Sequence, residues 1–308
     1  MQNFSVIFTF SEAYAMASNY KKRSGDRSDG RRVRSLSGFF NFIPYIMPHR
    51  NDALINYEEA FEVSNAEHWL REQRKNGYKG MGILHLIIAA YIRCIAVLPG
   101  LNRFAIGRRI YARNSIEVVL AVKRSMALDA AETTIKVEFD PTDTIYDVHR
   151  KMNKAIDDVK SSDDMNDVED FANKFAKMPR FVIRFAMWII KVLDYFGLLP
   201  QKLLKLSPFH GSMIITDLGS LGIGPVYHHI YNFGTLPVFI SFGAKRTAYE
   251  LDKFGDSQEK RYVDAKFTLD ERIVDGHYYA TVLKQLSQYI ADPSVLEVPP
   301  EIVVEDVF

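Results

Sequence analysis

The segment LDERIVDGHYY, residues 269–279, places carboxylates and a glycine at the end of an alternating run, a pattern that can carry acid–base chemistry. In YVDAKFTLDE, residues 262–271, apolar side chains at the odd positions alternate with polar ones, as in a half-buried strand. If that strand continues, Glu271 falls on the apolar face, where an unpaired carboxylate costs several kcal/mol or takes up a proton. We then expect it to meet an arginine, a hydroxyl or a water-filled cavity. If the strand instead ends at Asp270, Glu271 turns into solvent.

Other residue types that often carry chemistry do not form a recognisable motif. GSLGIG, residues 219–224, is followed by Pro225 rather than by a helix, so it predicts a tight turn and not a phosphate-binding loop. The sequence contains no GxSxG or HExxH motif. His228 and His229 are adjacent and would point to opposite faces of an extended segment, which is poor geometry for one metal ion. We therefore predict no metal site.

The composition argues against several classes of function. The 308 residues carry 39 Lys and Arg against 38 Asp and Glu, and a net charge of +1 does not favour bulk attraction to nucleic acid. Cys94 is the single cysteine and lies in an apolar run, which indicates a buried thiol in a reducing compartment. Residues 1–23 put their charge after the apolar part, unlike a secretory signal. A cytoplasmic protein is expected.

No segment reaches the roughly 18 uninterrupted apolar residues that a membrane span requires. Residues 180–206 come nearest, but Arg184, Lys191 and Asp194 interrupt them. As amphipathic helices they are expected to pack on a core, line an apolar tunnel or touch a partner, and a peripheral membrane contact stays open.

Hydrophobic periodicity predicts a fold of mixed α/β class, with two layers. The predicted helices span residues 65–77, 80–101, 144–160 and 276–290, and the predicted strands span 115–124, 133–140, 211–222, 235–246 and 261–271. Because helices and strands do not alternate regularly, we expect a mixed β-sheet with helices packed on one side, an α+β arrangement, rather than a doubly wound parallel sheet.

The ends of the chain differ in charge from its middle, and we predict a basic arm at 1–31, a main domain at 32–292 and an acidic tail at 293–308. Residues 21–34 hold seven basic and two acidic side chains with Ser and Gly between them, typical of a flexible arm or an extended strap. Residues 157–170 hold seven acidic side chains and one lysine, which indicates a solvated helix junction or a surface that opposes the arm.

Several segments, in order, resemble the chloramphenicol acetyltransferase superfamily, which includes the catalytic domain of the dihydrolipoyl acyltransferases of 2-oxoacid dehydrogenase complexes. LDERIVDGHYYATVLKQLSQYI is similar to the HxxxDG segment and the helix after it, and GSMIITDLGSLGIG to a stretch that usually reads TFTISNLGxxG. TLPVFISFG resembles the following strand, and residues 62–104 resemble a helix pair near the family's N-terminus. The resemblance covers roughly residues 32–124 and 210–292; residues 150–209 look like an enlarged helical insertion.

The resemblance implies a chloramphenicol acetyltransferase-like fold and roles for particular residues. The family's general base, the histidine of HxxxDG, falls at Glu271, and the serine that stabilises the tetrahedral oxyanion falls at Thr216. Asp275 and Gly276 retain the rest of the motif. The family's aspartate is mainly structural and is tied to an arginine of the N-terminal region, for which Arg32 and Arg34 are the candidates.

The same resemblance implies acyl-CoA as the donor, a small or lipophilic acceptor, and a homotrimer or a multiple of it with active sites at subunit interfaces. No lipoyl domain or subunit-binding domain precedes the matching region, so we expect no lipoyl group on this chain and no standard role inside a dehydrogenase complex.

The glutamate at position 271 leaves the chemistry open. An ordinary glutamate has a pKa near 4.3 against about 8.5 for a thiol, so without burial Glu271 is a weak base for such an acceptor. Three alternatives follow: a carboxylate base tuned by burial, a displaced histidine such as His277 or His210, or a chain that has lost acyl transfer and acts as a binding or assembly module.

Overall fold

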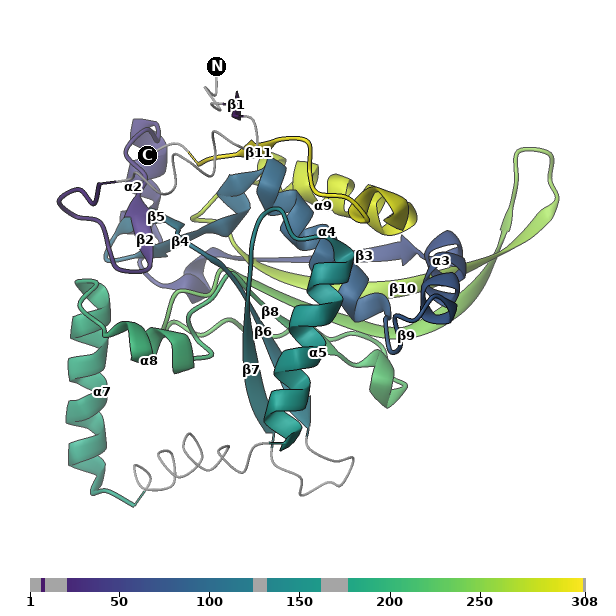
Figure 1. Ribbon diagram of the computed structural model, residues 1–308. Helices are drawn as coiled ribbons and strands as arrows, with labels where there is room; N and C mark the ends of the chain where they lie inside the picture. The colour runs from purple at the N-terminus through teal and green to yellow at the C-terminus, as the bar shows by residue number, and fades with distance from the viewer. Residues whose placement is uncertain (1–6, 9–20, 124–131, 162–176, 307–308) are drawn as a thin grey trace.

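The computed structural model describes residues 7–8, 21–123, 132–161 and 177–306, and its centre is a six-stranded sheet (Figure 1). In spatial order the strands are β3 (Leu54–Glu62), β10 (Ser257–Asp270), β9 (Val238–Leu251), β8 (Met213–Asp217), β6 (Ile116–Lys123) and β7 (Glu132–Phe139). β8 runs parallel to both of its neighbours, whereas the other pairs are antiparallel. The predicted mixed sheet is confirmed.

A layer of helices covers one face of this sheet (Figure 1). It consists of α3 (Ser64–Lys75), α4 (Ile83–Val97), α5 (Ile145–Ser161) and α9 (Gly276–Ala291). α4 is buried on nearly all sides, as expected for a helix that is apolar all round, and Cys94 lies within it as a buried free thiol. This sandwich of helices and sheet contains the main hydrophobic core.

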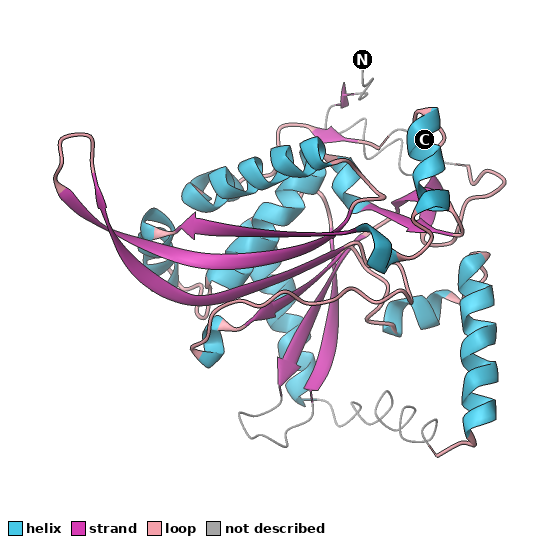
Figure 2. Cartoon of the chain, turned by 180° about the vertical axis from the view of Figure 1, so that it is seen from behind, coloured by secondary structure: helices cyan, strands magenta, loops and turns pink. Residues whose placement is uncertain are grey.

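The opposite face of the sheet lacks such a layer (Figure 2). A smaller apolar cluster forms there from Val119, Ile230, Leu236 and Phe239, because the loop between β8 and β9 crosses the strands. Within that loop Val226 is tied to the sheet, since its N–H donates to Ser241 Oγ at 3.1 Å. Several large apolar side chains of the loop remain exposed: Leu221, Ile223, Val226, Tyr227 and Tyr231.

A second, three-stranded sheet holds the basic segment near the N-terminus. Its strands are β2 (Gly30–Arg32), β5 (Arg109–Arg113) and β4 (Arg103–Ile106), in that order. The predicted boundary between arm and main domain at residue 31 falls inside β2, and Arg27 is only 5% exposed. Residues 21–34 therefore form a strap that packs against the main domain. Residues 1–6 and 9–20 lie outside the described residues, as does most of the acidic segment 157–170.

Short elements complete the chain. They are β1 (Ile7–Phe8), α2 (Gly38–Ile46), α7 (Arg180–Tyr195), α8 (Gln201–Leu206), β11 (Val303–Val304) and the 3₁₀ turns η1 (Arg50–Ala53), η2 (Pro99–Asn102), η4 (Gly219–Leu221) and η5 (Pro293–Leu296). β11 pairs with β1, and Asp306 accepts hydrogen bonds from Arg103, so the predicted tail packs on the domain. In the described chain no helix is long and apolar enough to span a membrane.

Candidate active site

Thr216 lies near the carboxyl end of β8, opposite Ser241 of β9. Because Ser241 lies opposite Lys266 on the polar side of β10, Thr216 is on the sheet face that has no helix layer. Its Oγ1 is buried and has no hydrogen-bond partner within the described residues. A buried hydroxyl without a partner has lost its hydrogen bonds to water and gained none from the protein, so this atom is a candidate donor to a bound ligand.

In the turn after Thr216 the backbone of Gly219 lies close to the backbone of Gly243. A Cβ on Gly219 would lie 2.7 Å from the carbonyl oxygen of Gly243, so only glycine fits at this position. The turn lets Ser220 N donate to Asp217 Oδ1 at 3.0 Å. Burial nevertheless raises the pKa of Asp217. The next element after the short 3₁₀ turn η4 is β9 and not an α-helix, as Pro225 predicted.

A cavity of about 550 Å³ opens beside Asp217 and Gly219. Among its lining residues are the cations Arg71, Arg74, Lys245 and Arg261, two carboxylates, Glu67 and Asp217, and the backbone at the N-terminus of α4. Glu67 pairs with Lys245 and with Arg261.

Two of these cations are directed at the backbone. Arg71 Nε donates to the carbonyl of Glu67 at 3.3 Å, and Arg74 Nη1 donates to that of Met81 at 2.8 Å. Neither guanidinium is neutralised by these carbonyls. With the N-terminus of α4 nearby, the cavity has the positive character that suits a phosphate-bearing ligand.

β10 ends at Asp270, so of the two alternatives for Glu271 the structure has the turn rather than the continued strand. Glu271 is half-buried, and its N–H donates to the carbonyl of Ala53 at 2.8 Å. The apolar face of β10 therefore ends at Leu269, and Glu271 lies in the turn between β10 and α9.

The buried carboxylate of this junction is Asp270, which is 0% exposed. Arg272 donates to it from Nε at 2.8 Å and from Nη2 at 2.7 Å, and Arg50 donates from Nε at 3.2 Å. Tyr279 Oη donates to its backbone carbonyl at 2.9 Å. Sequence alternation placed Asp270 on the polar face and missed this network. Arg272, two residues later in the sequence, was the feature that could have indicated a buried ion pair at Asp270.

The retained motif residues serve the start of α9. Asp275 is the N-cap of α9, and its Oδ1 accepts from Tyr278 N at 2.8 Å, while Gly276 is the first helical residue. Among the described residues neither proposed arginine pairs with Asp275. Arg34 instead lies 3.1 Å from Asp26, and Arg32 N donates to the same carboxylate. In this structure Asp275 thus caps α9.

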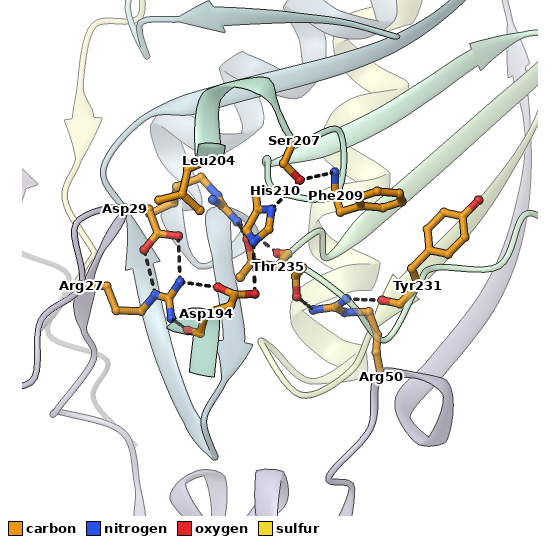
Figure 3. Close-up of polar contacts among 12 residues, drawn as sticks. Arg27, Asp29, Arg50, Asp194, Leu204, Ser207, Phe209, His210, Tyr231 and Thr235 are labelled. Atoms are coloured by element: carbon orange, nitrogen blue, oxygen red, sulfur yellow. Dashed lines mark hydrogen bonds and ion pairs between the residues drawn. The ribbon is translucent and has the colours of Figure 1, made fainter. Parts of the chain in front are cut away.

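The two histidines considered as alternative bases differ in exposure and in hydrogen bonding. His277 is exposed in the first turn of α9. His210 is buried and is held on both ring nitrogens, by Ser207 Oγ at 2.8 Å and by Asp194 Oδ2 at 3.1 Å (Figure 3). Because Asp194 is also paired with Arg27, His210 belongs to a structural network rather than to an open site.

Thr216 and Glu271 lie well apart on the sheet, on either side of β9. Thr216 is level with Lys266 across β9, and Glu271 follows Lys266 by five residues, or about 16 Å along the strand direction. Two strand spacings of about 4.8 Å add to this separation. The two groups therefore cannot act on one reacting atom within a single chain.

Within the described residues, no three His, Cys, Asp or Glu side chains lie close enough together to hold a metal ion.

No protein-family model matches this sequence, and no curated protein matches it either. Solved structures do match. The dihydrolipoamide acetyltransferase of Azotobacter vinelandii matches with a TM-score of 0.55 at 14% identity, over 89% of this chain and 95% of that one. A probable dihydrolipoamide acetyltransferase from Listeria monocytogenes 4b F2365 matches with a TM-score of 0.53 at 12% identity, over 85% and 94%.

A chloramphenicol acetyltransferase matches with a TM-score of 0.50 at 11% identity, over 81% of this chain and 93% of that one. At these identities the likeness concerns the fold. The fold expected from the motifs is confirmed: the chain has the chloramphenicol acetyltransferase-like fold, shared with the dihydrolipoamide acetyltransferase catalytic cores.

Proposed function

We propose that this chain is an acyltransferase that uses acyl-CoA, with an active site formed between two copies of the chain. The buried Thr216 hydroxyl, which lacks a hydrogen-bond partner among the described residues, is the observation that carries the proposal. The next residue, Asp217, lines the cationic cavity from the helix-covered face of the sheet. Thr216 of one copy donates to the oxyanion, and Glu271 of the neighbouring copy takes the proton of the acceptor.

The reaction follows from these two roles. The thiol or hydroxyl of the acceptor transfers its proton to the Glu271 carboxylate while its sulfur or oxygen bonds to the acyl carbon. The carbonyl oxygen becomes an oxyanion, which Thr216 Oγ1 stabilises by donating a hydrogen bond. The carbon–sulfur bond of the thioester then breaks, and the leaving thiolate takes up the proton held by Glu271.

The residues of the cavity fit a CoA donor. CoA carries phosphate groups, and the guanidinium groups of Arg71 and Arg74 together with the N-terminus of α4 supply donors of the matching charge. The acceptor is a small molecule, and apolar surface near Thr216 suits a lipophilic one.

Assembly of at least two copies is part of the proposal, because the separation of Thr216 from Glu271 leaves each chain with half of a site. The exposed apolar side chains between β8 and β9 support it, since such a surface on the open face of the sheet is typical of an interface. We propose a homotrimer or a multiple of it. The buried thiol of Cys94 fits a cytoplasmic location.

The second candidate is a non-catalytic relative that serves as a binding or assembly module. The observation that favours it is the carboxylate at position 271, where the resembling family has a histidine. Measuring CoA binding together with turnover separates the two candidates.

The test mixes two inactive variants. Thr216→Val and Glu271→Gln should each lower the rate of acyl transfer from acetyl-CoA by about 10²-fold or more, since each removes one catalytic group. Dihydrolipoamide and chloramphenicol are the first acceptors to try, with acetyl-CoA consumption followed by mass spectrometry. Co-expressing the two variants should restore part of the activity, because some interfaces then combine an intact Thr216 with an intact Glu271.

Thr247→Val is the matched control, since it makes the same change at an exposed threonine of β9 that lies outside the cavity. It should keep the rate of the unaltered chain. Full activity of Glu271→Gln would remove Glu271 as the base. Absence of turnover, with CoA binding intact in calorimetry, would favour the non-catalytic module.

A further inference from the structure

Two helices expose apolar faces to solvent at the same end of the molecule. On α7, Phe181, Phe185 and Trp188 are 74, 62 and 59% exposed, and their spacing of four and three residues places them on one stripe. On α2 the exposed apolar side chains are Phe39, Phe42, Tyr45 and Ile46. These faces lie on the outside of the fold, away from either hydrophobic core.

The two helices lie beside each other, because residues of both line the same cavity. Pro44 of α2 and Lys191 and Tyr195 of α7 line one cavity of about 470 Å³, and both views show the helices on the same side of the molecule (Figures 1 and 2). α7 is anchored at its C-terminal end, where Asp194 is paired with Arg27 at 2.9 Å and with His210 at 3.1 Å (Figure 3).

The exposed charge on this segment has a single sign. Residues 177–206 are all described, and their exposed charged side chains are Lys177, Arg180, Arg184, Lys191, Lys202 and Lys205. Asp194 is the one acidic residue of the segment and is buried in the pairing just described. Since the whole chain carries a net charge of only +1, this end concentrates positive charge beside apolar surface.

A second cavity beside α2 adds more cations. It measures about 470 Å³ and lies between α2 and β5, and its charged lining residues are Arg32, Arg34, Arg108 and Arg109, with no carboxylate among the lining residues. Arg34 is paired with Asp26 at 3.1 Å, and a bound anion would further offset the like charges gathered around this cavity. The fork of N–H donors on each guanidinium matches the oxygens of a phosphate.

The backbone places one of these arginines in a conformation that arginine rarely adopts. Arg108 has a φ of +60°, directly after Gly107 at +58°, in the turn between β4 and β5. Its guanidinium lies over the ring of Tyr45 at 5.6 Å, and Nη1 donates to the Tyr45 carbonyl at 3.3 Å. The left-handed turn thus aims a cation at the exposed face of α2.

We propose that α2, α7 and the arginine-lined cavity form a docking face for a bilayer that contains anionic phospholipid. The aromatic side chains of both helices enter the boundary between headgroups and acyl chains, and the arginines bind phosphate headgroups. Self-association through α7 is disfavoured by the like charges that it would bring together, whereas an anionic surface complements them. This inference is independent of the proposed acyl transfer.

Vesicle binding of the whole chain tests the proposal. The chain should sediment with vesicles of phosphatidylcholine and phosphatidylserine, bind much less to phosphatidylcholine alone, and dissociate as salt is added. Trp188 reports insertion directly in a Trp69→Phe background, because the chain has two tryptophans and Trp69 is half-buried and bonded to Glu297. Its emission should shift to shorter wavelength on binding.

Two sets of substitutions separate the apolar from the ionic contribution. The combined change Arg180→Gln, Arg184→Gln and Lys191→Gln should weaken vesicle binding about a hundredfold, since each basic residue near an anionic surface contributes about fivefold. The combined change Phe181→Ser, Phe185→Ser and Trp188→Ser should abolish binding. All six side chains are exposed, so circular dichroism should show an unchanged fold.

Matched controls lie elsewhere on the surface. Tyr249→Ser, Leu251→Ser and Phe254→Ser remove equally exposed apolar groups from the hairpin of β9 and β10, and Lys75→Gln, Lys79→Gln and Lys253→Gln remove three exposed cations. Both control sets should leave vesicle binding within twofold of the unaltered chain.

Three results would overturn the proposal. One is equal binding to neutral and anionic vesicles. Another is vesicle binding that the α7 substitutions leave unchanged, combined with a lower mass in solution, which would assign the face to a second copy. The third is complete competition by inorganic phosphate with no effect of the apolar substitutions, which would assign the arginines to a soluble anion.

Discussion

At the scale of single residues, His85 shows how burial changes the chemistry of a side chain. It lies in the first turn of α4, where Gly82 N donates to its Nδ1 at 3.2 Å. Burial, reinforced by the neighbouring His149, lowers the pKa of His85 to about 4. The folded chain therefore holds this imidazole neutral over a pH range in which the unfolded chain protonates it.

This difference predicts a loss of stability in mild acid. Below pH 6.5 the unfolded state gains a proton that the folded state does not, so the free energy of unfolding falls until the pH reaches about 4. The loss attributable to His85 should be about 3 kcal/mol. Urea unfolding of the unaltered chain and of His85→Gln between pH 7 and pH 4 measures it, and the variant should show the shallower dependence. Equal slopes would contradict the assignment.

At the scale of elements, the junction after β10 is fixed by one buried carboxylate. Asp270 joins the end of β10 to Arg50 of η1 and to Arg272 in the turn that carries Glu271. The position of Glu271 therefore depends on a network that links two segments distant in sequence, the turn η1 and residues 270–272.

Asp270→Asn should destabilise the fold by about 3–5 kcal/mol, because it leaves two buried guanidinium groups without their counter-charge. Asp264→Asn is the control on the same strand: Asp264 also pairs with an arginine, Arg246, but the side chains of Arg246 and Asp264 are 48 and 37% exposed. Its loss should cost no more than about 1 kcal/mol. Urea denaturation gives both values, and similar costs for the two variants would show that the buried network does not hold the junction.

At the scale of the whole molecule, the two faces of the central sheet differ in how far they are covered. The helix layer closes one face of the sheet, whereas the other face carries an exposed apolar loop next to Thr216. Pairing of copies across that face would cover the loop and bring Thr216 toward a neighbour's Glu271.

The combined change Leu221→Ser, Ile223→Ser and Val226→Ser should reduce the mass in solution toward that of one chain, because it removes apolar surface that association would bury. Light scattering during size exclusion measures the mass. The α7 serine variant is the control and should keep the mass of the unaltered assembly. An unchanged mass in the loop variant would place the interface elsewhere.

Local patterns in the sequence determined the elements and the class of the fold. Ile135, Val137 and Phe139 are buried on β7 while Glu138 is exposed, as alternation predicted, because side-chain period depends only on neighbours along the chain. The same holds for the apolar helix α4 and for the glycine-built turn that follows Thr216. The motifs also predicted the chloramphenicol acetyltransferase-like fold.

Only the tertiary structure decided which groups meet. Alternation could not show that Asp270 is enclosed by Arg50 and Arg272, or that Arg27 is buried against Asp194, since these partners are separated by up to 220 residues. It also could not show that Thr216 and Glu271 lie well apart on one sheet, on either side of β9. Strand register and direction set that separation, and both depend on contacts between segments far apart in the sequence.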